Sequence, residues 1–111
     1  MALPDFINAL PGVALPISED KVSARAIRSD RGLAVFFTIH EDLELPLHSH
    51  GDQWGTVLEG EMTLTIGGET KVYRPGDSYF IPAGVEHGAK LPAGAVILDV
   101  FAEADRYPLR D

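Results

Sequence analysis

The 111-residue sequence contains no cysteine, which removes several classes of site at once. Disulfide frameworks, zinc ribbons, thiolate nucleophiles and iron–sulfur clusters all require cysteine sulfur. Any metal would be held by histidine, carboxylate or amide groups. No run approaches the ~20 consecutive apolar residues that cross a bilayer, and the N-terminal segment lacks the basic start of a signal peptide. We therefore expect a cytoplasmic protein with no membrane partner.

Positive charge is also scarce. Nine Lys and Arg residues stand against seventeen Asp and Glu residues, which gives a formal net charge of −8. A surface of this sign repels phosphate backbones, so we expect no nucleic-acid partner. The chain is long enough for one domain but leaves a thin margin of core. Burial of a further surface against a second copy would add to the stability of the fold, and we therefore expect a homodimer.

No helix of normal length fits between the turn residues. Eleven Gly and eight Pro residues divide the chain into runs of strand length. Turn residues at 30–32 and 67–68 are typical of hairpins. Many short strands of this spacing predict an all-β sandwich or barrel of the jelly-roll kind. The expected strands are 22–28, 33–40, 54–59, 62–66, 70–74, 78–81 and 95–101.

Period-two alternation predicts which side chains face the interior of the barrel. An inward Gln53 would place Gly55 on the same face, where the missing side chain would leave space. Trp54 would then point outward, into a sheet stack or a dimer contact. The run 33–39 is apolar on both sides and is expected to be buried on both faces.

The four histidines are the main chemical feature of the sequence. His48 and His50 are two residues apart, so in an extended chain both imidazoles point to one face and could reach one ion. The alternative is a pair of exposed loop histidines. His40 ends an apolar strand and is interpreted as a surface residue rather than a ligand. The fourth is His87.

Two motifs resemble those of the cupin superfamily. Residues 47–61, LHSHGDQWGTVLEGE, are similar to the first cupin motif, in which two His and an acid precede a glycine. Gly60 sets the register and places Gln53 where the family usually carries glutamate. Residues 75–87, PGDSYFIPAGVEH, are similar to the second motif. The resemblance implies a single-domain cupin jelly-roll β-barrel, with residues 1–20 as an N-terminal arm or interface strand and 21–111 as the barrel.

The resemblance also implies one metal at the mouth of the barrel. The ligands that it implies are His48, His50, Gln53 and His87. Three features depart from the family pattern. Asp42 stands in place of a glycine, the spacer between His50 and the position of Gln53 is short, and Leu91 stands in place of a polar residue. The short spacer and the glutamine in place of glutamate affect the set of metal ligands directly.

A glutamine in the ligand set has chemical consequences. Three neutral imidazoles and a neutral amide leave a divalent ion its full charge, which predicts weaker retention, a stronger Lewis acid and a preference for anionic ligands. Zn, Ni, Fe, Mn and Co are all compatible as the one divalent metal ion. Alternatively, Gln53 hydrogen-bonds a substrate or orients a histidine. Tyr79 or Phe80 should line the pocket, and the Tyr79 hydroxyl is a candidate catalytic acid or hydrogen-bond donor.

We therefore expect a small metal-binding cupin that acts as a redox-neutral Lewis-acid enzyme of the isomerase, cyclase or lyase type. Its substrate would be a small anionic metabolite. Two alternatives remain open, because one fold hosts many functions. One is a non-catalytic module that binds a small molecule, and the other is a metal-dependent dioxygenase.

Overall fold

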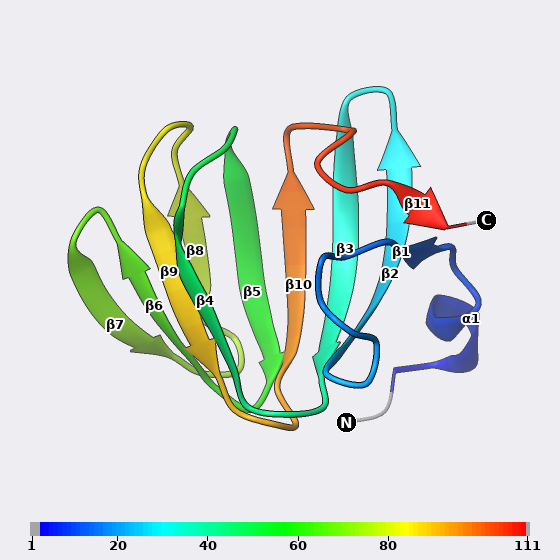
Figure 1. Cartoon of the computed structure of the whole chain (residues 1–111), viewed down its shortest axis with the longest axis horizontal. Coiled ribbons are helices and arrows are strands. Elements are labelled where there is room, and N and C mark those ends of the chain that lie inside the picture. Colours follow the sequence, from blue (N-terminus) through cyan, green and yellow to red (C-terminus); the bar gives the residue numbers. More distant parts are fainter. Residues whose placement is uncertain (1–2, 111) are drawn as a thin grey trace.

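The computed structural model describes residues 3–110. Residues 1, 2 and 111, which fall in the expected arm and barrel, lie outside the described residues. The only helix of the described part has four residues, and no helix there is long and apolar enough to cross a membrane. The elements are α1 (Asp5–Asn8), β1 (Gly12–Val13), β2 (Val22–Ser29), β3 (Gly32–Ile39), β4 (Leu43–His48), β5 (Gln53–Glu59), β6 (Met62–Ile66), β7 (Glu69–Tyr73), β8 (Ser78–Ile81), β9 (His87–Leu91), β10 (Val96–Phe101) and β11 (Leu109–Arg110) (Figure 1).

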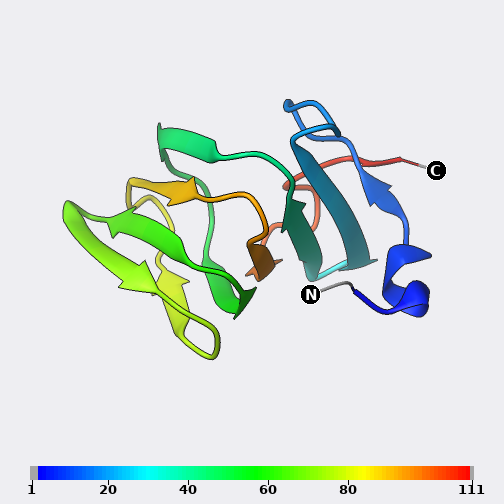
Figure 2. The same cartoon turned by 90° about the horizontal axis from the view of Figure 1, so that it is seen from below.

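The strands form two antiparallel sheets, which confirms the all-β prediction. The larger sheet has the order β11-β1-β2-β3-β10-β5-β8, and the smaller has the order β4-β9-β6-β7. Figure 2 shows the two layers from below. Apolar side chains from both sheets meet between them, among them Val57, Leu64 and Ile97, each at most 4% exposed. In the predicted N-terminal arm, β1 pairs with both β2 and β11.

The seven predicted strands are present, with ends that differ by at most one residue. The prediction missed β1, β4, β9 and β11. Strand β4 contains Pro46, which cannot donate to a sheet, and Pro is tolerated there because β4 lies at the edge of the smaller sheet. Its register with β9 shifts between Leu45 and His48, at the proline. Strand β9, HGAKL, is poor in the β-branched and aromatic residues that signal a strand.

Strands β4 and β9 carry two of the histidines, and Gly88 allows the two strands to approach closely. A Cβ at Gly88 would lie 2.8 Å from the Leu45 carbonyl oxygen, so any other residue would force the strands apart. The register places His48 opposite His87. The pairing of these strands therefore brings the histidines of the two motifs together.

The larger sheet has one covered face and one open face. In β5, Gln53, Gly55 and Val57 are buried while Trp54 is exposed, as alternation predicted. The expectation that residues 33–39 are buried on both faces is wrong. Ala34 and Phe36 are only partly buried, because no layer formed by residues 3–110 covers the outer face of β3.

Candidate metal centre

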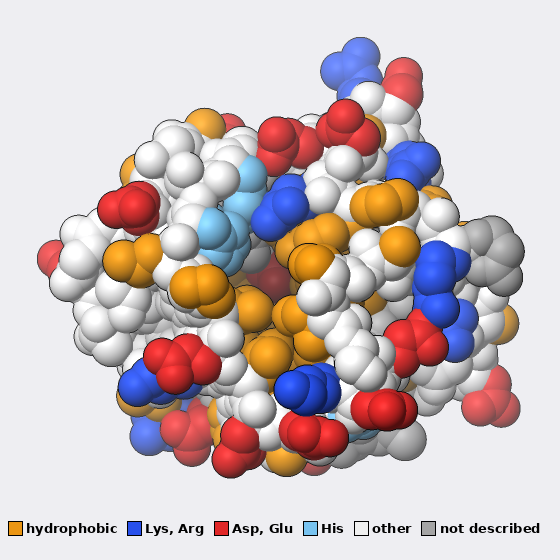
Figure 3. Space-filling model, in the orientation of Figure 1, with side chains coloured by type: hydrophobic (Ala, Val, Ile, Leu, Met, Phe, Trp, Pro, Cys, Tyr) orange, Lys and Arg blue, Asp and Glu red, His pale blue; other side chains and the backbone are white. Residues whose placement is uncertain are grey.

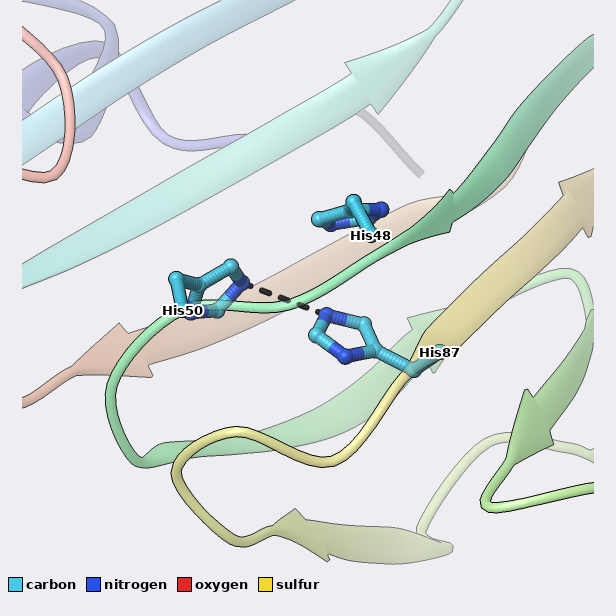
Figure 4. Close-up of side chains that lie close together, drawn as sticks. All are labelled: His48, His50 and His87. Atoms are coloured by element: carbon cyan, nitrogen blue, oxygen red, sulfur yellow. Dashed lines mark hydrogen bonds between the residues drawn. The ribbon is translucent and has the colours of Figure 1, made fainter.

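Three histidines lie together at one end of the barrel. His48 ends β4, His50 lies in the loop that follows, and His87 begins β9 (Figure 4). One ring nitrogen from each lies within 4.8 Å of the others, an arrangement that could hold a metal ion. His40 is exposed, and its Nε2 shares a hydrogen bond of 2.5 Å with the Ser23 hydroxyl instead. The structure therefore groups the three motif histidines and leaves His40 apart.

Backbone contacts of the three rings fix their tautomers. The Nδ1 atoms of His48, His50 and His87 lie 2.9, 3.0 and 3.0 Å from the carbonyl oxygens of residues 46, 51 and 85. A carbonyl oxygen only accepts hydrogen bonds, so each Nδ1 carries the proton and donates it. In a neutral ring this leaves an unprotonated lone pair on Nε2, the atom that a metal would take.

Two of the remaining nitrogens are spaced as ligands of one ion would be. The Nε2 atoms of His50 and His87 lie 3.2 Å apart, along the dashed line in Figure 4. Two nitrogens bound at ~2.1 Å to one ion would be separated by roughly 3.0 to 3.4 Å for bond angles between 90° and 109°. Burial and the positive charge of Arg106 lower the pKa of His50, and burial lowers the pKa of His87. Both shifts favour the neutral rings that metals bind.

The loop that carries His50 is tied to the second motif. The Gly84 amide donates to the His50 carbonyl at 2.9 Å, and the Ala83 amide donates to the Asp52 carboxylate at 2.7 Å. Gly84 has a φ of 80°, which is readily accessible only to glycine. The Gly51 amide donates to Glu103 at 2.9 Å. These bonds hold His50 in place without any regular secondary structure.

Gln53 lies in the same cavity as the histidines and bonds to a buried carboxylate. Its side chain is 8% exposed and hydrogen-bonds Asp99. An ionised carboxylate has no proton to donate and only accepts, so the Gln53 amide nitrogen donates, and the Gln53 carbonyl oxygen is the atom available to a metal. The structure thus places Gln53 with the histidines, and its role as a ligand remains a prediction.

Tyr79 is held by the same carboxylate. Its hydroxyl donates to Asp99 at 2.6 Å inside the barrel. Burial, followed by the Asp99 charge, raises the pKa of Tyr79. Burial also raises the pKa of Asp99 to about 6, although the hydrogen bonds from Tyr79 and Gln53 act in the opposite direction. The catalytic role of Tyr79 stays a prediction, and the structure shows that the hydroxyl it would use is hydrogen-bonded to Asp99.

The space expected at Gly55 is filled. A Cβ at Gly55 would overlap the Asp99 carboxylate and the Tyr79 hydroxyl. The prediction that Gly55 leaves room beside a metal is therefore wrong. The glycine is needed because the Tyr79–Asp99 hydrogen bond passes directly over its backbone.

Arg106 brings positive charge to the mouth of the cavity. Its guanidinium lies over the Tyr107 ring at 4.4 Å and the Phe101 ring at 5.8 Å. Its Nε is buried and has no hydrogen-bond acceptor among the described residues. An unpaired buried donor costs free energy, and an anionic group at this position would pair it.

The cavity that contains these residues is polar at one end and apolar at the other. Its volume is about 260 Å³, near the lower limit of small-molecule pockets, ~300 Å³. The His48–His87 pair marks the polar end, whereas the paired Leu43 and Leu91 mark the other end of the same two strands. Figure 3 shows the hollow, with histidines and a basic side chain at its rim and hydrophobic side chains in its floor.

Sequence reasoning missed Asp99 and Arg106. Asp99 could have been found, because it is the only charged residue in the apolar strand VILDVF and shares the inward face of Ile97 and Phe101. Arg106 could not have been found in this way, because it lies in an irregular segment after β10. Such a segment has no alternating pattern from which the position of its side chains could be predicted.

The structure is a small two-sheet β-barrel with three histidines at its mouth that could bind a metal ion. The cupin domain model matches residues 35–101, and the chain belongs to the cupin family. A search of the curated proteins finds no match. This membership confirms the resemblance found in the sequence and the predicted single-domain fold.

Solved structures agree with this assignment. An RmlC-like cupin from Shewanella frigidimarina has a TM-score of 0.77 and 27% identity, covering 89% of this chain and 88% of the other. KdgF from Halomonas has a TM-score of 0.69 and 24% identity, covering 86% of both chains. An oxalate decarboxylase variant from Bacillus subtilis has a TM-score of 0.71 and 20% identity, covering 89% of this chain and 29% of the other. The last two show the fold alone.

Proposed function

We propose that this cupin is a metal-dependent enzyme that performs redox-neutral Lewis-acid chemistry, of the isomerase, cyclase or lyase type, on a small carboxylate. The observation that carries the proposal is a group of three histidines whose ring nitrogens lie within 4.8 Å of one another while the Nδ1 atom of each ring is hydrogen-bonded to a backbone carbonyl. Rings held in this tautomer have only Nε2 free, and the Nε2 atoms of His50 and His87 lie 3.2 Å apart with no proton between them. Such an arrangement is costly to maintain without a cation.

His48, His50 and His87 would hold the metal, with the carbonyl oxygen of Gln53 as a fourth donor. Imidazole and amide oxygen suit divalent Zn, Ni, Fe, Mn and Co. A bound divalent ion would act as a Lewis acid that polarises a carbonyl or enolate oxygen of the substrate. Because all four donors are neutral, the ion would keep its charge and favour an anionic ligand.

Arg106 supports a carboxylate substrate independently of the metal. Its Nε has no acceptor within residues 3–110, and its charge acts on both His50 and His87, so it lies close to the proposed metal position. A substrate carboxylate would pair with this guanidinium. The apolar walls beyond, with Leu43 and Leu91, suit a ligand whose other end is hydrocarbon.

Asp99 and Tyr79 would handle the proton in the reaction. The Asp99 carboxylate lies in the cavity wall, and its bonds from Gln53 and Tyr79 hold it in one orientation. It would take a proton from the substrate and return it at another atom, as a redox-neutral isomerisation requires. Tyr79 would position Asp99 through its hydroxyl.

Elemental analysis of protein purified without a metal-affinity tag tests the metal site. We expect near one equivalent of a divalent ion in the wild type and none in His50→Ala. His40→Ala is the matched control, because His40 is exposed and outside the cluster, and it should keep the metal. Gln53→Glu should hold the ion more tightly. No metal in the wild type after reconstitution would refute the proposal.

A second experiment separates turnover from the two alternative functions. The metal-loaded protein is incubated with a panel of small carboxylates and keto acids, and products are followed by NMR while dissolved oxygen is recorded. Isomerisation, cyclisation or elimination without oxygen uptake is the expected result. Oxygen consumption that accompanies product would indicate a dioxygenase instead. Saturable binding of a panel member without any product would indicate a binding module.

A further inference from the structure

We propose that Glu103 is a positioning residue of the metal centre, which holds the loop of His50 and supplies negative charge beside the ion without being a ligand. This inference rests on the proposed function, because it assumes a cation at the three histidines. The four proposed donors are all neutral and would leave the ion its full charge. Within residues 3–110, no carboxylate joins the group of His48, His50 and His87. A charge that balances the ion would therefore come from a residue beside the donors.

The carboxylate of Glu103 lies beside the protonated nitrogen of His50. Its Oε1 atom is 3.8 Å from the His50 Nδ1, whereas the ring presents Nε2 to His87. A carboxylate next to the free nitrogen of a metal-binding histidine orients the ring and strengthens it as a ligand. Because the His50 side chain is only 8% exposed, its ring is shielded from water and interacts with this charge more strongly than an exposed ring would.

Two other carboxylates near the histidines make different contacts. Asp52 accepts a hydrogen bond from the Ala83 amide at 2.7 Å, and Asp99 accepts one from the Tyr79 hydroxyl at 2.6 Å. In the part of the chain that the structure describes, only Glu103 brings a carboxylate oxygen close enough to one of the three rings to form an ion pair. Its charge is therefore applied to a proposed ligand directly.

One turn after β10 carries both charges of the cavity mouth. The Arg106 amide donates to the Glu103 carbonyl oxygen at 3.2 Å, which closes the turn. The positive charge of Arg106 acts on His50 and His87 and would repel a cation held there. The carboxylate of Glu103 offsets this repulsion, so the turn can present a guanidinium to a substrate without expelling the ion.

Gly51 provides the space that the Glu103 side chain occupies. The Gly51 amide donates to Oε1 of Glu103 at 2.9 Å. A Cβ at Gly51 would have three atoms of Glu103 as its nearest neighbours, namely Cγ at 2.9 Å, Cδ at 3.0 Å and Oε1 at 3.2 Å. Beside this contact, the Ala102 amide donates to the Asp52 carbonyl oxygen at 2.9 Å. The residue that follows His50 is thus fitted to a glutamate 52 positions away.

Zinc affinity, measured by competition with a chelating indicator at low ionic strength, tests the charge. Glu103→Gln keeps an oxygen that can accept the Gly51 amide and removes the charge, whereas Glu103→Ala removes both. We expect Glu103→Gln to bind zinc about tenfold more weakly than the wild type, since partners of metal-binding histidines typically contribute 10–100-fold. Glu61→Gln is the matched control and should bind as the wild type does. Glu61 is exposed and lies beyond the far end of β5, roughly 20 Å along the strand from Gln53.

Salt separates the charge from the hydrogen bond. The Glu103 side chain is 45% exposed, so dissolved ions screen its field, and the Debye length falls from ~10 Å at 0.1 M salt to ~3 Å at 1 M. The deficit of Glu103→Gln should therefore shrink as sodium nitrate is raised to about 1 M. The additional deficit of Glu103→Ala, which comes from the lost bond to Gly51, should remain. A deficit of Glu103→Gln that is independent of salt would overturn the charge effect.

Gly51→Ala tests the same contact from the other side. Gly51 does not have a positive φ, so alanine can adopt its backbone conformation, and the added methyl group should displace the Glu103 side chain. We expect Gly51→Ala to lower zinc affinity about tenfold in the wild type and to have no further effect in Glu103→Ala. Equal losses in the two backgrounds would overturn the assigned contact.

The outcomes distinguish this inference from the proposed function. Equal zinc affinities of the wild type, Glu103→Gln and Glu103→Ala would overturn the role of Glu103 and leave the metal centre standing. A wild type that binds no zinc would overturn both. Circular dichroism of each metal-free variant is recorded first, so that a loss of affinity is assigned to the site only in a folded protein.

Discussion

The buried Asp99 predicts a specific dependence of stability on pH. In Asp99→Asn the side chain keeps its shape and can still accept the Tyr79 hydroxyl, but it no longer ionises. The folded wild type raises the pKa of Asp99 from 3.8 to about 6, chiefly through burial. Folding therefore favours the protonated carboxyl, and the substitution removes this preference.

The sign and size of the effect follow from proton linkage. Because the folded pKa is the higher one, the folded state binds more protons than the unfolded state between pH 4 and 6. The contribution of Asp99 to stability is present below pH 4 and is lost as the pH rises through 6. A difference of about two pKa units corresponds to roughly 3 kcal/mol. Relative to the wild type, Asp99→Asn should therefore gain about 3 kcal/mol between pH 4 and pH 7.5.

Urea denaturation followed by Trp54 fluorescence measures this difference. Both proteins are treated with a chelator, so that metal binding does not add its own pH dependence, and are compared at several pH values. The lowered pKa values of His50 and His87 add an opposite slope to both proteins, and this slope cancels in the comparison. A stability difference that stays constant or reverses with rising pH would refute the account of Asp99 as a buried acid.

Three further predictions concern other parts of the site. Gly55→Ala should lower the free energy of unfolding by roughly 1–3 kcal/mol through overpacking against Tyr79, measured by urea denaturation; wild-type stability would contradict this. Zinc at 100 times its Kd should stabilise the wild type by about 2.7 kcal/mol and should leave the stability of His87→Ala unchanged, as measured by thermal unfolding. Equal increases in the unfolding temperature of both proteins would place the ion elsewhere. Arg106→Gln should weaken the binding of hexanoate to the zinc-loaded protein about tenfold, since a hydrogen bond to a charged group is worth ~1.5–3 kcal/mol, and the metal content should stay unchanged. Equal affinities of the two proteins in calorimetry would exclude the guanidinium as a contact of the carboxylate.

The sequence predicted the parts of this fold that local patterns encode. Alternation located the MTLTI strand of β6 to the residue and, given an inward Gln53, put Gly55 on the same face and Trp54 on the other. It failed for β4, where Pro46 argues against a strand unless one knows that the strand lies at an edge. Whether a strand is at an edge depends on contacts with distant segments, and no local pattern carries that information.

The candidate site shows the same limit. His48, His50 and His87 lie in recognisable motifs, so they could be predicted, but the tautomer of each ring depends on backbone carbonyls that only the folded chain places. Asp99 was overlooked because its partners Tyr79 and Gln53 are 20 and 46 positions away along the chain. The space expected at Gly55 was wrong for the same reason, since Tyr79 fills it from another strand.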